Sequence, residues 1–398
     1  MEQQQMTISG YVEDGALPGL VSLIDRGGDV QTEVLGTMDL AGRKPMRRDA
    51  LFRITSMSKP ITATATLILV EDGVIGLDEP VDDYLPELAG QRVLSRIDGP
   101  LDDTVPAQRS ITVRDLLTFR LGFGFAFEIP DDAPVLRAER ELGLRTLAAP
   151  TPPSELEPNE WMRRFGSLPL MQQPGERWMY QTGTHVLSIL IPRVSGMPLE
   201  TFFQERIFGP LGMVDTRFSV PAEKRERFVD CIEFDSLSGK LELHDAPGAS
   251  YWGDAPPTFP DGSGGLVSTV DDYHAFARML LGGGKLGSER ILREESVREM
   301  TTDQITPEQK AISPFFPGFW DSQGWGLGVG IATGPDDISR TAGRIGWGGG
   351  YGTSWYADPN EDLVAVLMFQ RTMDDVAAGA TATYWKSLYR GLQGDQPE

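Results

Sequence analysis

The 398-residue sequence predicts an α/β protein with an all-α insertion, in which an antiparallel sheet flanked by helices carries a helical second lobe. Runs rich in β-branched and aromatic residues occur near both ends of the chain. Helical patterns broken by prolines and loops fill the middle. We therefore predict that residues 1–88 and 261–398 build one α/β domain around a shared sheet. Residues 89–260 are predicted to form a mostly helical domain inserted into it.

The N-terminal part predicts a hairpin followed by a long helix. Residues 20–25 and 30–35 are strand-like and flank the turn Arg-Gly-Gly-Asp. The helix begins at Ser56, is apolar over most of residues 61–70, and ends near Gly73. A second helical segment is predicted over 111–117, with Thr112 as its N-cap.

The rest of the chain continues the pattern of a helical middle and a strand-rich end. Residues 268–272 supply a good N-cap for an amphipathic helix that ends at Gly282, and Gly196 separates two earlier helices. The predicted helices cover 155–165, 183–194, 199–207, 270–281 and 374–392, and the predicted strands cover 325–331, 352–356 and 363–370.

Composition excludes several classes of partner. The formal net charge of −22 argues against nucleic acids and against anionic membrane surfaces, which both need clustered lysine and arginine. A single cysteine, Cys231, excludes a framework of internal disulfides. The start of the sequence has no basic and apolar segments of a secretory signal, and no apolar run approaches the ~18 residues that span a bilayer. We expect a cytoplasmic protein.

The stretch Ser56-Met57-Ser58-Lys59 carries the first chemical signal. Residues three apart at the start of a helix share one face, so Ser56 and Lys59 can touch. A serine hydroxyl becomes a nucleophile when a nearby base takes its proton. Lysine can do so only when its pKa falls well below ~10.4, and both burial and a helix N-terminus lower it. The same N-terminus offers the N–H of Ser56 to an oxyanion.

Two further stretches complete a pattern that resembles a known family. The motif at 56–59, the segment 174–180 that ends in Tyr180, and the glycine-rich segment 346–352 occur in the order found in the penicillin-recognising serine hydrolases. These include class C β-lactamases and penicillin-binding proteins. Trp347-Gly348-Gly349 is similar to the form of the third motif in the β-lactamase-like carboxylesterases of family VIII. The resemblance covers nearly the whole chain and implies a β-lactamase/transpeptidase-like fold.

The resemblance implies a role for each motif. Tyr180 and Lys59 would act jointly as the base for Ser56, with the Tyr180 phenolate stabilised by Lys59 and the helix end. Tyr180 would then protonate the leaving group. The N–H groups of Ser56 and Gly350 would form the oxyanion hole. No metal and no organic cofactor is implied.

The remaining predicted contacts concern substrate binding. Glycines at 348 and 349 let a strand edge approach a substrate closely. Trp347 stands where β-lactamases usually carry lysine or histidine, so its flat ring suits an apolar acyl or alcohol group. Thr182 replaces the asparagine of the usual Tyr-x-Asn motif, which puts amide recognition in doubt. Aromatic residues in predicted loops add further contacts, of which we expect Phe123, Trp252 and Tyr351 to bind substrate.

Rival mechanisms find little support in the sequence. The only histidines are His185, His244 and His274, and no Gly-x-Ser-x-Gly turn occurs, so a Ser-His-Asp hydrolase is a poor match. No histidine pair has the spacing of a zinc hydrolase.

We therefore expect a serine hydrolase that cleaves small-molecule carboxylic esters with short-to-medium acyl or aryl groups through a Ser56 acyl-enzyme. Amide hydrolysis by the same fold (β-lactamase, D-amino-acid peptidase or oligomeric-amide hydrolase) and acyl transfer remain alternatives. So does a catalytically silent binding module. The sequence leaves open whether the protein is a monomer or a homodimer.

Overall fold

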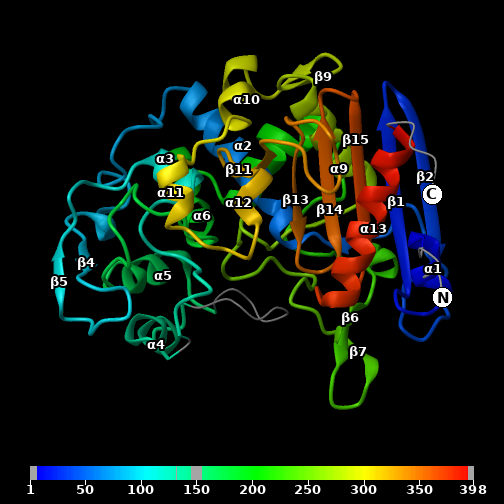
Figure 1. Cartoon of the computed structure of the whole chain (residues 1–398), viewed down its shortest axis with the longest axis horizontal. Coiled ribbons are helices and arrows are strands. Elements are labelled where there is room, and N and C mark those ends of the chain that lie inside the picture. The colour runs from blue at the N-terminus through cyan, green and yellow to red at the C-terminus, as the bar shows by residue number, and fades with distance from the viewer. Residues whose placement is uncertain (1–6, 131, 145–154, 393–398) are drawn as a thin grey trace.

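A seven-stranded antiparallel sheet with the order β11-β12-β13-β14-β15-β1-β2 forms one side of the molecule (Figure 1). The computed structural model describes residues 7–130, 132–144 and 155–392, so the outermost parts of the predicted α/β domain, 1–6 and 393–398, lie outside it. Strand β15 pairs along its whole length with β1, from Leu20 to Arg26, which joins both ends of the chain in one sheet. The strands are β1 (Gly19–Arg26), β2 (Asp29–Gly36), β11 (Gln323–Trp325), β12 (Gly330–Ala332), β13 (Ile345–Gly349), β14 (Thr353–Asp358) and β15 (Leu363–Phe369).

Both faces of the sheet are covered by helices, and β15 shows why. All seven of its residues are buried, and successive side chains enter two different hydrophobic clusters because a strand alternates its faces. Leu363, Ala365 and Leu367 pack with α13 (Asp375–Leu392), while Val364 and Val366 belong to the large core that contains α9 (Val270–Leu281). Helix α1 (Ile8–Glu13) lies beside α13.

Helix α2 (Ser58–Glu71) is the buried axis of the molecule. Twelve of its fourteen residues are buried, in agreement with the apolar pattern of the sequence. It packs against α6 (Thr182–Ser195) of the helical lobe. A single 3₁₀ turn, Thr55–Met57, precedes it, so Ser56 lies in this turn and not in the α-helix itself.

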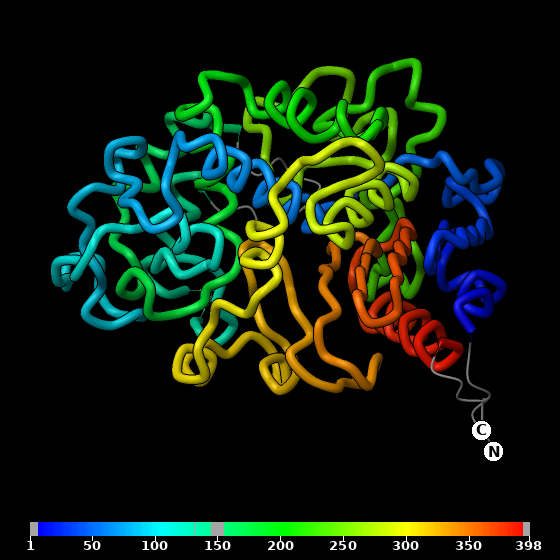
Figure 2. Tube along the Cα trace, turned by 90° about the horizontal axis from the view of Figure 1, so that it is seen from above, coloured from blue at the N-terminus to red at the C-terminus, as the bar shows by residue number. Residues whose placement is uncertain are grey.

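The helical lobe lies beside the sheet lobe, as the view from above shows (Figure 2). Thr112 caps its first helix, as predicted, and the structure adds a complete capping box with Asp115. Gly196 ends α6 in the left-handed conformation. The helices of this lobe are α3 (Val113–Leu117), α4 (Pro134–Glu141), α5 (Pro158–Phe165), α6, α7 (Leu199–Phe203), the π-helical turn Gln204–Phe208 and α8 (Gly209–Leu211). Helices α10 (Glu294–Met300), α11 (Pro307–Ala311) and α12 (Phe319–Ser322) follow α9.

Region 89–260 is less helical and less separate than the sequence predicted. It contains a β4–β5 ribbon (Arg92–Leu94 with Thr104–Pro106) and a β6–β7 hairpin (Cys231–Asp235 with Lys240–Asp245). The β6–β7 hairpin joins the sheet lobe, because Ile232 bridges to Arg371 and Asp245 pairs with the buried Arg53. The buried guanidinium of Arg53 needs a charged partner such as Asp245. The predicted domain boundary at residue 260 was drawn from local sequence pattern, so it placed Arg53 and Asp245 in different domains.

Two glycine-rich segments also differ from prediction. Residues 325–331 form no continuous strand, because the chain turns between β11 and β12 with Gly328 at a φ of +76°. Residues 345–349, with three glycines, form strand β13. Among the described residues, no single helix is long and apolar enough to cross a membrane. The segments Thr182–Ser195 and Leu199–Leu211 reach that length and composition only as a pair bent by 81°.

Candidate active site

Ser56 is delivered to the boundary between the lobes by a short strand and a strained turn. Strand β3 (Phe52–Arg53) pairs with β8 (Val267–Ser268) and leads directly into the turn. Thr55 has a φ of +43°, which is uncommon for a residue with a branched side chain. The hydroxyl of Thr353 holds this turn by donating to the Ile54 carbonyl at 3.1 Å. Ser56 is left partly exposed, on the wall of a groove.

Lys59 is in contact with Ser56, as the three-residue spacing predicted. Its Nζ lies 2.9 Å from Ser56 Oγ and donates to the Ser263 carbonyl at 2.8 Å. The side chain is completely buried. Burial lowers the pKa of Lys59 to about 7, against a smaller opposing effect of the negative charge of Asp261. An uncharged amine is therefore available beside Ser56 near neutral pH.

Tyr180, which lies just before α6, completes the cluster. Its side-chain hydroxyl hydrogen-bonds to Ser56 and accepts the indole N–H of Trp347 at 2.7 Å. Lys59 Nζ lies 4.7 Å from the centre of its ring. Burial raises the pKa of Tyr180 to about 12, although both hydrogen bonds lower it. At rest Tyr180 is therefore a protonated phenol beside the buried Lys59 amine. The joint role of the two groups as the base for Ser56 stays a prediction.

An aromatic cluster holds the Tyr180 ring. Phe119 meets it edge-on at 5.4 Å between ring centres, and Phe315 packs at the same separation. Trp347 belongs to this cluster through a perpendicular contact with the buried Trp325 at 4.7 Å. The prediction for Trp347 was incomplete, because its ring faces the groove but its N–H is bonded to Tyr180.

The glycines of β13 bring this strand against the Ser56 turn. A Cβ at Gly349 would lie 2.3 Å from the Ile54 carbonyl and 2.4 Å from the hydroxyls of Thr55 and Thr353, so no larger residue fits. Gly350 follows at the strand end, where an added Cβ meets nothing within 4 Å. Gly348 and Gly350 are exposed and line the same groove as Ser56. The oxyanion role of the Ser56 and Gly350 N–H groups stays a prediction.

The groove has a volume of about 1130 Å³ and a strongly aromatic wall. Ser56 and Tyr180 lie on it beside Trp347 and the three glycines. Four phenylalanines complete this part of the wall: Phe127, Phe315, Phe316 and Phe319. Phe127 and Phe316 are more than half exposed, at 59% and 54%, so apolar surface extends to the mouth of the groove.

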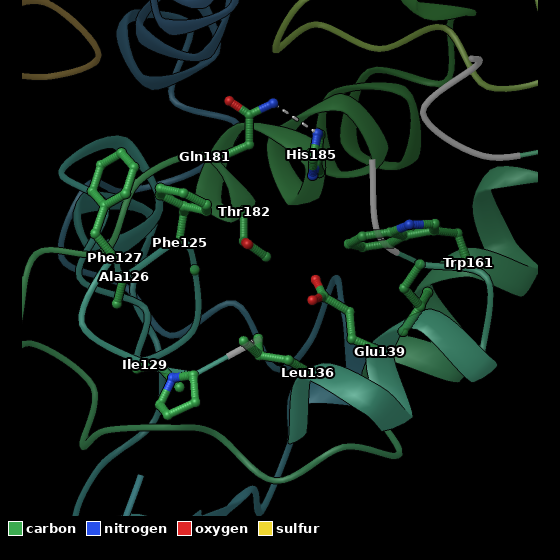
Figure 3. Close-up of a pocket in the computed structure, with 13 residues that line it drawn as sticks. Phe125, Ala126, Phe127, Ile129, Leu136, Glu139, Trp161, Gln181, Thr182 and His185 are labelled. Carbon is green, nitrogen blue, oxygen red and sulfur yellow. Dashed lines mark hydrogen bonds between the residues drawn. The ribbon is translucent and has the colours of Figure 1, made fainter. Parts of the chain in front are cut away.

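The other predicted substrate contacts do not line this groove. Thr182 lies on a second pocket of about 620 Å³, between Gln181 and Phe125 on one side and Trp161 on the other (Figure 3). Phe123 is buried in the core against Phe165.

Two aromatic residues predicted to bind substrate are instead buried in a hydrophobic cluster near Arg53. Trp252 packs over its guanidinium and donates its N–H to the Gly265 carbonyl at 2.7 Å. The Tyr351 hydroxyl lies 3.3 Å from His244 Nε2. Loop composition alone does not separate aromatic residues that line a cleft from those that fill a core.

Sequence reasoning missed three residues behind Lys59. These are Asp261 and Ser263, in a glycine-rich segment of the chain, and Gln181, which directly follows Tyr180. The Gln181 amide donates to Ser263 Oγ at 2.9 Å. No local pattern indicated these contacts.

The sheet with its helical lobe, and the serine–lysine–tyrosine cluster between them, define the class of β-lactamase-like serine hydrolases. The family model described as Beta-lactamase matches residues 5–389, and the chain belongs to this family. It is 36% identical to Protein Rv1367c of Mycobacterium tuberculosis, over 100% of this chain and 97% of that protein. It is 28% identical to esterase EstB of Burkholderia gladioli, over 94% and 91%. A structure of a simvastatin synthase mutant from Aspergillus terreus superposes with a TM-score of 0.78 at 26% identity, over 97% and 94%.

Proposed function

We propose that the protein hydrolyses carboxylic esters through a covalent Ser56 acyl-enzyme. The contact between Ser56 Oγ and Lys59 Nζ, with Lys59 buried and its pKa lowered to about 7, carries the proposal. Esters with short-to-medium acyl or aryl groups are the proposed substrates. The similarity to esterase EstB supports ester chemistry, and so does an indole where a lysine would bind the carboxylate of a β-lactam.

In the acylation step, the Ser56 oxygen attacks the ester carbonyl carbon while its proton passes to neutral Lys59. The tetrahedral intermediate collapses, the bond to the alkoxy oxygen breaks, and this oxygen takes the Tyr180 proton. The Tyr180 phenolate then recovers a proton from the Lys59 ammonium. The Trp347 N–H stabilises the transient phenolate. In deacylation, water attacks the acyl carbon, gives its proton to the Lys59–Tyr180 pair, and Ser56 leaves with a proton.

The direct test is hydrolysis of p-nitrophenyl acetate and butyrate by the wild type and by Ser56→Ala. We expect the variant to lose turnover by at least about three orders of magnitude. Ser58→Ala is the matched control, because its hydroxyl turns away to accept the Leu266 N–H at 3.3 Å. Labelling with a fluorophosphonate should modify Ser56 in the wild type. Equal rates for the wild type and Ser56→Ala, or a wild type that takes no label, would contradict the proposal and favour a binding module.

Acyl transfer is a second candidate, favoured by the size of the groove. A volume of about 1130 Å³ exceeds what a short ester fills, which leaves room for an acceptor alcohol. The structurally similar protein from Aspergillus terreus is a simvastatin synthase. Product analysis with added alcohols distinguishes the two, because a transferase forms a new ester faster than free acid. High turnover of nitrocefin or D-aminoacyl amides with weak esterase activity would instead favour amide hydrolysis.

A further inference from the structure

Ser263 contacts Lys59 directly and is linked to Tyr180 through its chain neighbour Gln181. Its main-chain oxygen accepts Lys59 Nζ at 2.8 Å, and its side-chain oxygen accepts the Gln181 amide at 2.9 Å. Gln181 directly follows Tyr180 in the chain. Ser263 is completely buried, so these bonds do not compete with solvent. One residue therefore connects the base to the turn that presents the phenol.

The turn at Gln181 needs such an anchor. Its φ of +90° and ψ of −62° are rare for any residue with a side chain. The Phe125 N–H donates to the Tyr180 carbonyl at 2.9 Å and holds one side of the turn. On the other side, the Gln181 side chain is bonded to Ser263 and faces His185 Nε2 at 3.3 Å (Figure 3). The contact with Ser263 therefore stabilises this rare backbone conformation of Gln181.

Asp261 in turn fixes the orientation of Ser263. Its carboxylate is 3% exposed and accepts both the main-chain N–H and the hydroxyl of Ser263, each at 2.8 Å. Because the Ser263 proton points at Asp261, the Ser263 oxygen keeps a lone pair free for the Gln181 amide. The Ser263 carbonyl is thereby held toward Lys59.

Three titratable groups surround the Lys59 amine among the described residues. Tyr180 lies in front of it and Asp261 behind Ser263, and His185 approaches from α6. His185 is buried, which lowers its pKa and keeps it neutral, and its Nε2 lies 3.7 Å from Asp261. Among the described residues, the negative charge of Asp261 opposes the deprotonation of Lys59, against the larger effect of burial.

We propose that Asp261, Ser263 and Gln181 are positioning residues, which hold Lys59 and Tyr180 in register through Ser263 and set the pH range in which Lys59 acts as a base. The inference rests on the proposed function. It assigns separate effects to the members of the network: Asp261 acts on Lys59 mainly through its charge, and the Ser263 hydroxyl acts on Tyr180 through Gln181.

The test compares pH profiles of kcat/KM for p-nitrophenyl butyrate. In Asp261→Asn, loss of the negative charge makes the Lys59 ammonium less stable. The acid limb should therefore move down by roughly 0.5 to 1 pH unit, since Ser263 lies between the two groups. Asp39→Asn is the matched control, because Asp39 is also buried and accepts two main-chain N–H groups, at 2.9 and 2.8 Å, in a loop after β2. It should leave the limb unchanged.

Ser263→Ala keeps the carbonyl that accepts Lys59 and removes the contact with Gln181. We expect kcat to fall by roughly tenfold, the effect of a displaced catalytic group, with KM and the acid limb unchanged. Ser263→Thr restores the hydroxyl and should recover most of the loss, whereas a merely structural role would make the larger threonine worse than alanine.

The outcomes separate this inference from the proposed function. An active Ser56→Ala variant defeats the proposed function. Suppose that Ser56→Ala is inactive, that Asp261→Asn leaves the acid limb of the pH profile unshifted, and that Ser263→Ala keeps the full kcat. These results would overturn the positioning role of Asp261, Ser263 and Gln181 and leave the proposed function standing. If Asp261→Asn fails to fold, the test uses kcat of the variants Ser263→Ala and Gln181→Leu. A wild-type kcat in both variants would overturn the inference.

Discussion

The hydrogen bond from Trp347 to Tyr180 makes a demanding prediction about the leaving group. Trp347→Phe removes the N–H but keeps an aromatic ring against Trp325. The bond is short, at 2.7 Å, and gains strength when Tyr180 gives its proton to the leaving alcohol and becomes a phenolate. A hydrogen bond to a charged group contributes ~1.5–3 kcal/mol. We therefore expect a loss of roughly 10- to 150-fold in the rate of protonation-dependent acylation.

The assay compares two butyrate esters. Ethoxide is a poor leaving group and needs the Tyr180 proton, whereas p-nitrophenolate leaves without one. Trp347→Phe should therefore lose most of its kcat/KM on ethyl butyrate and much less on p-nitrophenyl butyrate. The physical cause is that the hydrogen bond lowers the pKa of Tyr180, so its loss makes the phenolate harder to form.

Trp325→Phe is the matched control for this experiment. Its indole N–H donates to the Leu117 carbonyl at 3.3 Å, away from the Tyr180 hydroxyl. This variant should lose stability with no dependence on the leaving group. Equal losses on both esters in Trp347→Phe, or the same leaving-group dependence in Trp325→Phe, would refute the reasoning.

Three further predictions follow from the geometry. Because Lys59 acts only when uncharged and burial lowers its pKa to about 7, kcat/KM should rise with pH through about 7, and Lys59→Arg should abolish turnover at every pH below ~11. Gly349→Ala should lose activity in steady-state assays because its Cβ would lie 2.3 Å from a carbonyl oxygen, whereas Gly350→Ala, with open space around it, should retain most of it. Urea unfolding should show a loss of ~3–5 kcal/mol for Arg53→Ala, which strands a buried carboxylate, but under ~1 kcal/mol for Arg48→Ala in an exposed pair.

Features set by neighbours along the chain were predictable from the sequence. The N-terminal hairpin, the Thr112 capping box and the stop at Gly196 each depend on residues within a few positions of one another. The contact between Ser56 and Lys59 belongs to this group, because one turn of helix brings residues three apart together. For this reason the spacing of one motif predicted the contact between the two side chains.

Tertiary structure alone decided the surroundings of that pair. Trp347 meets Tyr180 across 167 residues, and Ser263 meets Lys59 across 204. It also decided which aromatic residues face the groove, since Phe127 is 59% exposed while Phe123 is buried. Hydrogen bonding and burial depend on which distant segments pack together, so they could not be predicted from residue type and local spacing. The sequence determined which groups can react, and packing determined their protonation states, their orientation and the space beside them.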